Sequence, residues 1–179
     1  HVLDCEADQV VITHGTDTVE ETAFLFDLTL PTHKPVVFVG SMRPADAVGY
    51  DGLRNFANAL QVMRSPEAAG RGVMVVMGDK VIAARDVRKA RTRGLDAFDG
   101  FPRPAIALVT PSALEWFGAA WRVEEEARFK FSGALPDVPI LYVHAGMAPD
   151  YVDRLVTADT RGIVVAGLGE GNMPDPVRQ

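Results

Sequence analysis

Short hydrophobic runs alternate with segments of helical periodicity along most of the chain. Runs of four or five apolar residues are typical of strands that are buried on both faces. These runs cover residues 10–13, 36–39, 73–77, 140–143 and 163–166. Between the runs, apolar residues recur at helical spacing, as in Val19–Ala23–Phe26, Leu53–Phe56–Ala57–Leu60–Met63 and Val152–Leu155–Val156. The pattern predicts an α/β protein with a mostly parallel sheet and helices on both faces.

Two regions depart from this alternation. In residues 73–85, a strand is followed by Gly78–Asp79–Lys80 and a second apolar run, which predicts a β-hairpin appended to the parallel sheet. Residues 92–139 contain five prolines and the charged run Glu124–Glu126, which is typical of irregular structure.

A new β-α-β unit begins near Val138. The sequence therefore predicts a first domain over residues 1–115, a linker over 116–137, and the start of a smaller α/β domain over 138–179.

Composition limits the classes of function. Hydrophobic residues make up 47% and charged residues 23% of the 179 residues, which is typical of a globular protein. The net charge is −6 and no basic stripe runs along the chain, so we expect no nucleic-acid partner. No apolar run approaches the roughly 18 residues of a spanning helix, so we expect no membrane partner. The four histidines and Cys5 lack metal-ligand spacing, and no cofactor is expected.

The first residue is His1 and not methionine, and the last residues close no recognisable element. We therefore expect the chain to be a fragment, from which any targeting segment would be missing. The single cysteine excludes an internal disulfide and favours the cytoplasm slightly, while a periplasmic location stays open.

The strongest candidate for chemistry is the segment Thr13–Thr18, directly after the first predicted strand. Thr18 and Glu21 form a capping-box pattern, which predicts Thr18 as the N-cap of the next helix. Thr16 and Asp17 then lie in the crevice where open α/β sheets bind ligands, and Gly15 would let the backbone approach closely. On local chemistry alone, the same residues could simply be good turn and cap residues.

Three further segments carry weaker signals. The charged run Arg85–Lys89 is typical of a solvated surface, and Gly40–Pro44 could line a pocket or simply form a turn. Gly167–Asn172 is rich in glycine, but it lacks the spacing of a dinucleotide-binding loop.

Together these segments resemble the bacterial asparaginase/glutaminase family. Residues 12–23, Ile-Thr-His-Gly-Thr-Asp-Thr-Val-Glu-Glu-Thr-Ala, match a signature of that family almost throughout. Further matching segments follow in the family's order, and the likeness is weakest over residues 97–137. These segments are Lys34–Val37, Gly40–Pro44, Asp51–Gly52, Val75–Met77, Arg85–Lys89 and Ala166–Asn172.

The resemblance implies roles for particular residues. Thr16, Asp17 and Lys89 correspond to the family's catalytic set, and Asp17 also to the carboxylate that holds the substrate's α-amino group. Gly15 and Ser41 lie where the family contacts its substrate. Asn172 corresponds to a residue that reaches a neighbouring active site, which implies a homo-oligomer, either a tetramer or a dimer.

The resemblance also implies the reaction, hydrolysis of L-asparagine, and of glutamine as a second candidate substrate, to the acid and ammonia. The attacking threonine of the family lies in a Thr-Gly-Gly-Thr segment that residues 1–179 do not contain. A threonine hydroxyl needs a base, and a lysine amine accepts a proton only while uncharged. We expect Thr16 to relay a proton between Lys89 and the reaction centre, or to orient the attacking water.

Two alternatives stay open. The ammonia-supplying subunit of a tRNA-dependent amidotransferase would share the same catalytic segments. A non-catalytic α/β binding or oligomerisation module would use the Thr16–Asp17 turn only as a helix cap, with Lys89 far from it. The distance from the Lys89 amine to Thr16 and Asp17 separates this module from an enzyme.

Without the family's nucleophile, residues 1–179 should not hydrolyse asparagine. We expect ammonia release from the purified chain to equal that of a heat-killed control, since the acylation step has no attacking group. An enzyme-coupled ammonia assay measures this, and release above the control would contradict the expectation.

Overall fold

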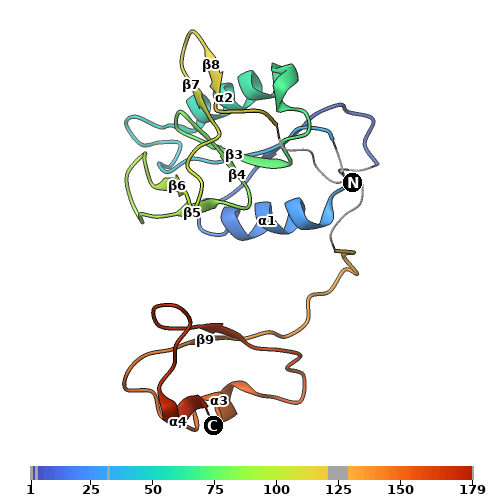
Figure 1. The fold of residues 1–179 in the computed structure, drawn as a ribbon. Coiled ribbons are helices and arrows are strands. Elements are labelled where there is room, and N and C mark those ends of the chain that lie inside the picture. Colours follow the sequence, from blue (N-terminus) through green and yellow to red (C-terminus); the bar gives the residue numbers. More distant parts are fainter. Residues whose placement is uncertain (1, 3, 32, 121–128, 179) are drawn as a thin grey trace. The chain divides into compact units, whose positions relative to one another are not determined.

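The computed structural model describes residues 2, 4–31, 33–120 and 129–178 of the chain, which divides into two compact units, His1–Lys130 and Phe131–Gln179. Figure 1 shows the elements of both units. In the first unit they are β1 (Val10–Thr13), α1 (Val19–Thr29), β2 (Val36–Val39), α2 (Gly52–Arg64), the 3-10 helix η1 (Pro66–Ala68), β3 (Val73–Met77), β4 (Lys80–Ala83), β5 (Val87–Lys89), β6 (Phe98–Gly100), β7 (Ala107–Val109) and β8 (Leu114–Trp116). In the second unit they are β9 (Ile140–Tyr142), α3 (Tyr151–Leu155), β10 (Val164–Ala166) and α4 (Asp175–Arg178).

The main sheet is mixed. Within the described residues it has six strands in the order β1-β2-β3-β4-β7-β8. β1, β2 and β3 pair in parallel, whereas β4, β7 and β8 pair antiparallel. The prediction of a mostly parallel sheet is therefore wrong. β7 and β8 are three-residue strands inside the region predicted to be irregular. β7 lies in the apolar run 105–109, but the nearby prolines Pro104 and Pro111 favoured an irregular segment there.

The β-hairpin predicted in residues 73–85 is confirmed. β3 and β4 pair antiparallel, with Met77 opposite Lys80. The two-residue loop begins at Gly78, whose φ of 61° is one that glycine adopts without steric cost.

Helices α1 and α2 cover opposite faces of the sheet, as predicted (Figure 1). Side chains alternate along β2, because successive residues of a strand point to opposite faces. Val36 and Phe38 belong to the buried cluster that contains α1, whereas Val37 and Val39 belong to the cluster that contains α2. Each helix therefore closes its own core against the central strands.

The buried face of α2 differs from the predicted one. Leu53 is 75% exposed and Phe56 is 40% exposed, although both belong to the predicted apolar stripe. The residues that α2 buries are Asn55, Ala59, Val62 and Met63. Asn55 is fully buried because it is hydrogen-bonded, and a pattern based on hydrophobicity assigns such a residue to the surface.

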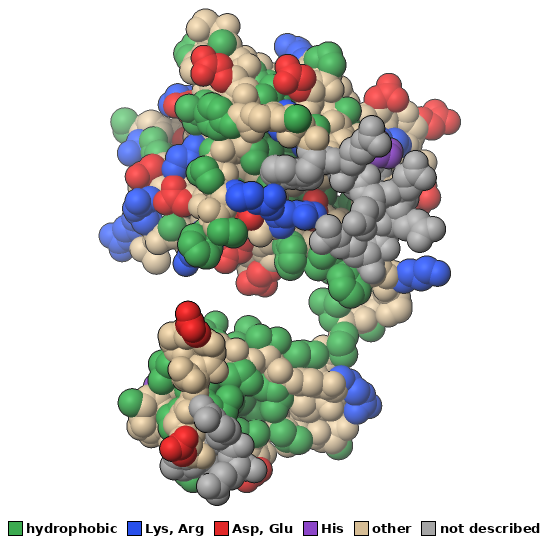
Figure 2. All heavy atoms as spheres, viewed as in Figure 1, with side chains coloured by type: hydrophobic (Ala, Val, Ile, Leu, Met, Phe, Trp, Pro, Cys, Tyr) green, Lys and Arg blue, Asp and Glu red, His purple; other side chains and the backbone are tan. Residues whose placement is uncertain are grey.

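The second unit contains a parallel two-stranded sheet of β9 and β10. Its buried cluster includes Leu141 and Met147, while Ile140 and Tyr142 are exposed. Figure 2 shows hydrophobic side chains on the surface of this unit. The prediction that these two strands are buried on both faces is therefore wrong for the unit by itself.

Two further predictions concern particular segments. The run Glu124–Glu126 lies outside the described residues. Among the helices that are described, none is long and apolar enough to cross a membrane.

Candidate active site

The turn between β1 and α1 carries Thr16 and Asp17. Helix α1 begins at Val19, so Thr18 occupies the predicted N-cap position. Its side chain makes no capping hydrogen bond, and the predicted capping box is therefore absent. The backbone carbonyl of Thr18 accepts the Thr22 N–H at 3.0 Å instead, so the helix starts on backbone hydrogen bonding.

Lys89 reaches this turn from β5, more than seventy residues later. Its Nζ donates to Thr16 Oγ1 at 3.0 Å and to Asp17 Oδ1 at 2.5 Å. The lysine side chain is 16% exposed and that of Asp17 is 89% exposed. The structure thus brings a hydroxyl, a carboxylate and an amine together, with the amine on the protein side and the carboxylate on the solvent side.

Lys89 lowers the pKa of Asp17 below its ordinary value of 3.8, first through the hydrogen bond and then through its positive charge. Because the folded pKa is the lower one, the pair stabilises the fold at pH values above the ordinary pKa. This contribution is lost as the pH falls through the lowered pKa of the folded state.

Two glycines shape the turn in different ways. A Cβ on Gly40, which directly follows β2, would lie 2.6 Å from the His14 carbonyl oxygen and 3.4 Å from Thr16 Cγ2. Gly40 therefore allows the ends of β1 and β2 to pack against each other. A Cβ on Gly15 would meet nothing within 4 Å, so the expected close approach of the backbone is not seen at Gly15.

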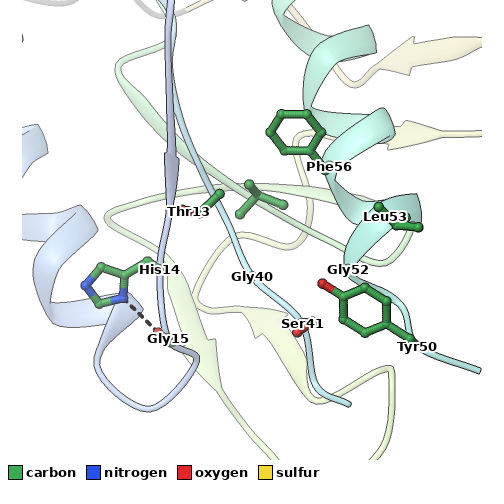
Figure 3. Close-up of a pocket in the computed structure, with 10 residues that line it drawn as sticks. Thr13, His14, Gly15, Gly40, Ser41, Tyr50, Gly52, Leu53 and Phe56 are labelled. Atoms are coloured by element: carbon green, nitrogen blue, oxygen red, sulfur yellow. Dashed lines mark hydrogen bonds between the residues drawn. The ribbon is translucent and has the colours of Figure 1, made fainter. Parts of the chain in front are cut away.

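Ser41 lines a pocket beside the turn that carries Thr16 and Asp17. The pocket has a volume of about 400 Å³ and opens between the ends of β1 and β2 and the start of α2, as Figure 3 shows. The residues that line it are Thr13, His14, Gly15, Val39, Gly40, Ser41, Tyr50, Gly52, Leu53 and Phe56. Gly15 and Ser41 are therefore pocket residues, whereas Thr16, Asp17 and Lys89 lie beyond its lining.

His14 has structural contacts. Its Nδ1 lies 2.7 Å from the Gly15 carbonyl oxygen (Figure 3), and its ring packs edge-on against Phe38 with the ring centroids 5.8 Å apart. Phe38 belongs to the core on the α1 side. The ring therefore belongs to the packing beside α1.

Asn172 lies in the second unit. It forms a bridge with Leu168, where its backbone N–H donates to the Leu168 carbonyl at 2.8 Å and its carbonyl accepts the Leu168 N–H at 2.8 Å. These contacts are local to the turn, so the role of Asn172 at a neighbouring site stays a prediction.

Asp51 and Asn55 support the Ser41 segment, a role that the sequence analysis did not assign. The Asp51 carboxylate accepts the Met42 N–H at 3.0 and 3.1 Å and the Arg43 N–H at 3.0 Å. Asn55 Nδ2 donates to Gly40 O at 2.9 Å and to Asp51 Oδ2 at 2.8 Å. The two residues thus hold the backbone on both sides of Ser41. In the sequence, the only local sign of this pair is the spacing of four residues, which brings Asp51 and Asn55 to one face of the helix.

The environment of Asp51 favours the charged carboxylate. Burial raises its pKa, but the hydrogen bonds from backbone amides and from Asn55 outweigh burial, so the pKa is lowered overall. Asn55 Oδ1 also accepts the Gly78 N–H at 3.1 Å. Asn55 therefore joins the turn after β2 to the β3–β4 loop.

No group of three or more His, Cys, Asp or Glu side chains suited to a metal ion occurs in the part of the chain that the structure describes. The groups at the Thr16–Asp17 turn are instead suited to acid–base chemistry and to holding a cationic substrate group.

The chain belongs to the asparaginase family. The family model described as "Asparaginase, N-terminal" matches residues 1–122, and the model described as "Glutaminase/Asparaginase C-terminal domain" matches residues 137–179. The resemblance inferred from the sequence motifs is therefore confirmed.

Particular relatives support this assignment. A probable L-asparaginase of Deinococcus radiodurans is 44% identical over 93% of this chain and 52% of its own length. A glutaminase-asparaginase of Pseudomonas fluorescens biotype A is 37% identical over 96% of this chain and 48% of its own length. The crystal structure of a probable cytoplasmic L-asparaginase from Campylobacter jejuni has a TM-score of 0.89 and 36% identity, and covers 97% of this chain and 56% of that chain. The chain thus spans about half the length of these relatives.

Replacement of Lys89 by methionine should raise the pKa of Asp17 toward 3.8, because both the hydrogen bond and the positive charge are removed. A pH titration of the side-chain carboxyl ¹³C resonances measures this shift. Lys80→Met is the matched control, since Lys80 forms a similar pair with Asp99 at 2.6 Å. The control should raise the pKa of Asp99 and leave that of Asp17 unchanged. An unchanged Asp17 pKa in Lys89→Met would show that the contact is absent in solution.

Asn55→Ala should lower the free energy of unfolding by about 2–4 kcal/mol, because several buried polar groups lose a partner at once. Urea unfolding measures this change. Gln61→Ala on the same helix is the control and should change the free energy by less than about 1 kcal/mol. Equal effects of the two substitutions would contradict the role assigned to Asn55.

Proposed function

We propose that this chain is the part of an L-asparaginase that carries three of its active-site residues. The full-length enzyme hydrolyses L-asparagine to L-aspartate and ammonia, with L-glutamine as a second substrate. The observation that carries the proposal is the contact of the Lys89 amine with Thr16 and Asp17, at 3.0 and 2.5 Å. The names of the relatives, which include L-asparaginases and glutaminase-asparaginases, support the choice of substrate.

Each residue has a distinct role in the proposed reaction. Asp17 binds the α-amino group of the substrate, and its 89% exposed side chain supports this role because a cation can reach it from solvent. Thr16 lies between Lys89 and the reaction centre and relays a proton or orients the attacking water. The attacking threonine is supplied by a segment outside residues 1–179, and it forms the acyl-enzyme that water then hydrolyses.

The Ser41 segment lies where it could contact the amide of the substrate. Ser41 and Gly15 line the 400 Å³ pocket, and Gly40 packs against both His14 and Thr16. Backbone groups that are held in place by other residues make good binding partners for a polar substrate, because little reorganisation is needed. The hydrogen bonds of Asp51 with the backbone after Ser41, and that of Asn55 with the Gly40 carbonyl before it, support such a role.

We further propose the division into a catalytic domain at 1–115, a linker at 116–137 and a second domain beginning at 138. The ranges of the two family models, which leave residues 123–136 unmatched, support a linker in this region. A homo-oligomer, either a tetramer or a dimer, in which Asn172 completes a neighbouring site, is part of the same proposal.

Lys89→Met in the full-length protein should lower kcat/KM for asparagine by roughly 10²–10⁴-fold, the usual contribution of a positioned acid or base. Ammonia release at several asparagine concentrations measures this. The control Lys80→Met removes a lysine whose ion pair is with Asp99, and it should keep turnover close to that of the unmodified protein.

Near-normal turnover in Lys89→Met would contradict the role of Lys89. Ammonia release only in the presence of a misacylated transfer RNA and an amidotransferase partner would favour the ammonia-supplying subunit. No release under either condition, from a correctly folded protein, would favour a binding module.

A further inference from the structure

The backbone of Lys89 is held by the same short segment that meets its side chain. A carboxylate oxygen of Glu20, Oε2, accepts a hydrogen bond from the Lys89 backbone N–H. Glu20 lies in the first turn of α1, three residues after Asp17. The segment from Thr16 to Glu20 therefore contacts Lys89 at two places, the amine through Thr16 and Asp17 and the backbone through Glu20.

The pairing of β5 explains why this N–H needs a partner outside its own sheet. Phe101 N–H donates to the Asp86 carbonyl at 2.8 Å, and Lys89 lies opposite Phe98. Hydrogen-bonded and non-hydrogen-bonded pairs alternate along an antiparallel ladder. Lys89, three residues after Asp86, therefore turns its N–H away from β6 and toward α1. A buried backbone donor without a partner is costly, so the Glu20 carboxylate satisfies a group that β6 cannot reach.

An ion pair joins α1 to the turn that precedes β5. Asp27 lies seven residues after Glu20, and a spacing of seven residues returns to the same face of a helix. Its carboxylate pairs with the Arg85 guanidinium at 2.7 Å and also accepts the Val73 N–H at 3.1 Å. Arg85 lies four residues before Lys89, and these contacts of Asp27 are with Arg85 and Val73 rather than with Thr16 or Asp17. Asp27 therefore serves as a control for Glu20, because it joins α1 to the same part of the chain without contacting the Thr16–Asp17 turn.

We propose that Glu20 is a positioning residue that fixes the backbone of Lys89, so that the amine stays within hydrogen-bonding distance of Thr16 and Asp17. The effect of Glu20 on catalysis rests on the proposed function, whereas its effect on the position of Lys89 can be tested without measuring turnover. Since a small displacement of a reacting group can cost about a hundredfold in rate, a residue that sets this distance also sets the efficiency of the site.

The pKa of Asp17 reports whether Lys89 stays in place. In Glu20→Ala, loss of the lysine contact should raise this pKa toward 3.8. Removal of a nearby negative charge by itself would lower the pKa, because a carboxylate ionises more easily when a like charge is taken away. The sign of the shift therefore distinguishes positioning from a simple charge effect. A ¹³C titration of residues 1–179 measures it, and an unchanged or further lowered pKa would overturn the proposal.

Three variants serve as controls. Glu20→Gln keeps a side-chain oxygen that can accept the Lys89 N–H, so the pKa of Asp17 should stay low. Glu21→Ala removes an exposed carboxylate of the same helical turn and should not raise the pKa. Asp27→Asn weakens the ion pair with Arg85, so it should reduce stability toward urea without raising the pKa of Asp17. A rise in Asp27→Asn as large as in Glu20→Ala would reduce Glu20 to a general structural role and overturn the proposal.

In the full-length protein, Glu20→Ala should lower kcat for asparagine by about ten- to hundredfold, and Glu20→Gln should restore most of it. A raised Asp17 pKa together with unchanged ammonia release would support positioning by Glu20 and would contradict the catalytic role proposed for Lys89. The titration and the turnover assay thus separate a failure of this inference from a failure of the proposed function.

Discussion

The contact of the Lys89 amine with Thr16 and Asp17 is the interaction on which the candidate site depends. It joins β5 to the turn after β1 across more than seventy residues, at 3.0 and 2.5 Å. Neither partner could hold the arrangement alone, because the carboxylate is largely in solvent, where an isolated ion pair contributes little to stability. The surrounding fold must therefore bring the lysine to the turn, through the pairing of β5 with β6 and the contact of Glu20 with the Lys89 backbone.

Two sets of buried or partly buried polar contacts provide that support. On the α2 side, Asp51 and Asn55 bind the backbone around Ser41 and the loop at Gly78. On the α1 side, Glu20 and Asp27 bind β5 and the residues before it. Both sets use carboxylates or amides at a helix to satisfy backbone groups of neighbouring strands and turns. Such groups fix loop geometry because an unmade hydrogen bond in a buried place is costly.

Sequence predicted those parts of the structure that have a hydrophobic pattern or a family motif, and it missed the others. Buried strands such as β2 and β3 were predicted because continuous apolar runs mark them. β7 and β8 were not predicted because the prolines around them favoured irregular structure, although β7 lies in the apolar run 105–109, and the antiparallel part of the sheet was therefore not expected. The contact of Lys89 with Thr16 was expected from family resemblance, since the run Arg85–Lys89 by itself looked like surface. The role of Glu20 was not predicted because its backbone partner is 69 residues away in sequence, and for Asn55 only the spacing from Asp51 gave a local signal.

The two contacts of α1, at Glu20 and at Asp27, limit the length of the chain between Arg85 and Lys89. Seven residues of α1 separate Glu20 from Asp27, a rise of about 10 Å. Their partners, Lys89 and Arg85, lie only four residues apart, across a turn and the short strand β5. The helix is therefore joined at two places to one short stretch of chain. Insertion of one residue within β5 would displace Lys89 by about 3.3 Å and turn its side chain to the other face. Changes of length should therefore be tolerated in the loops around this stretch but not within it.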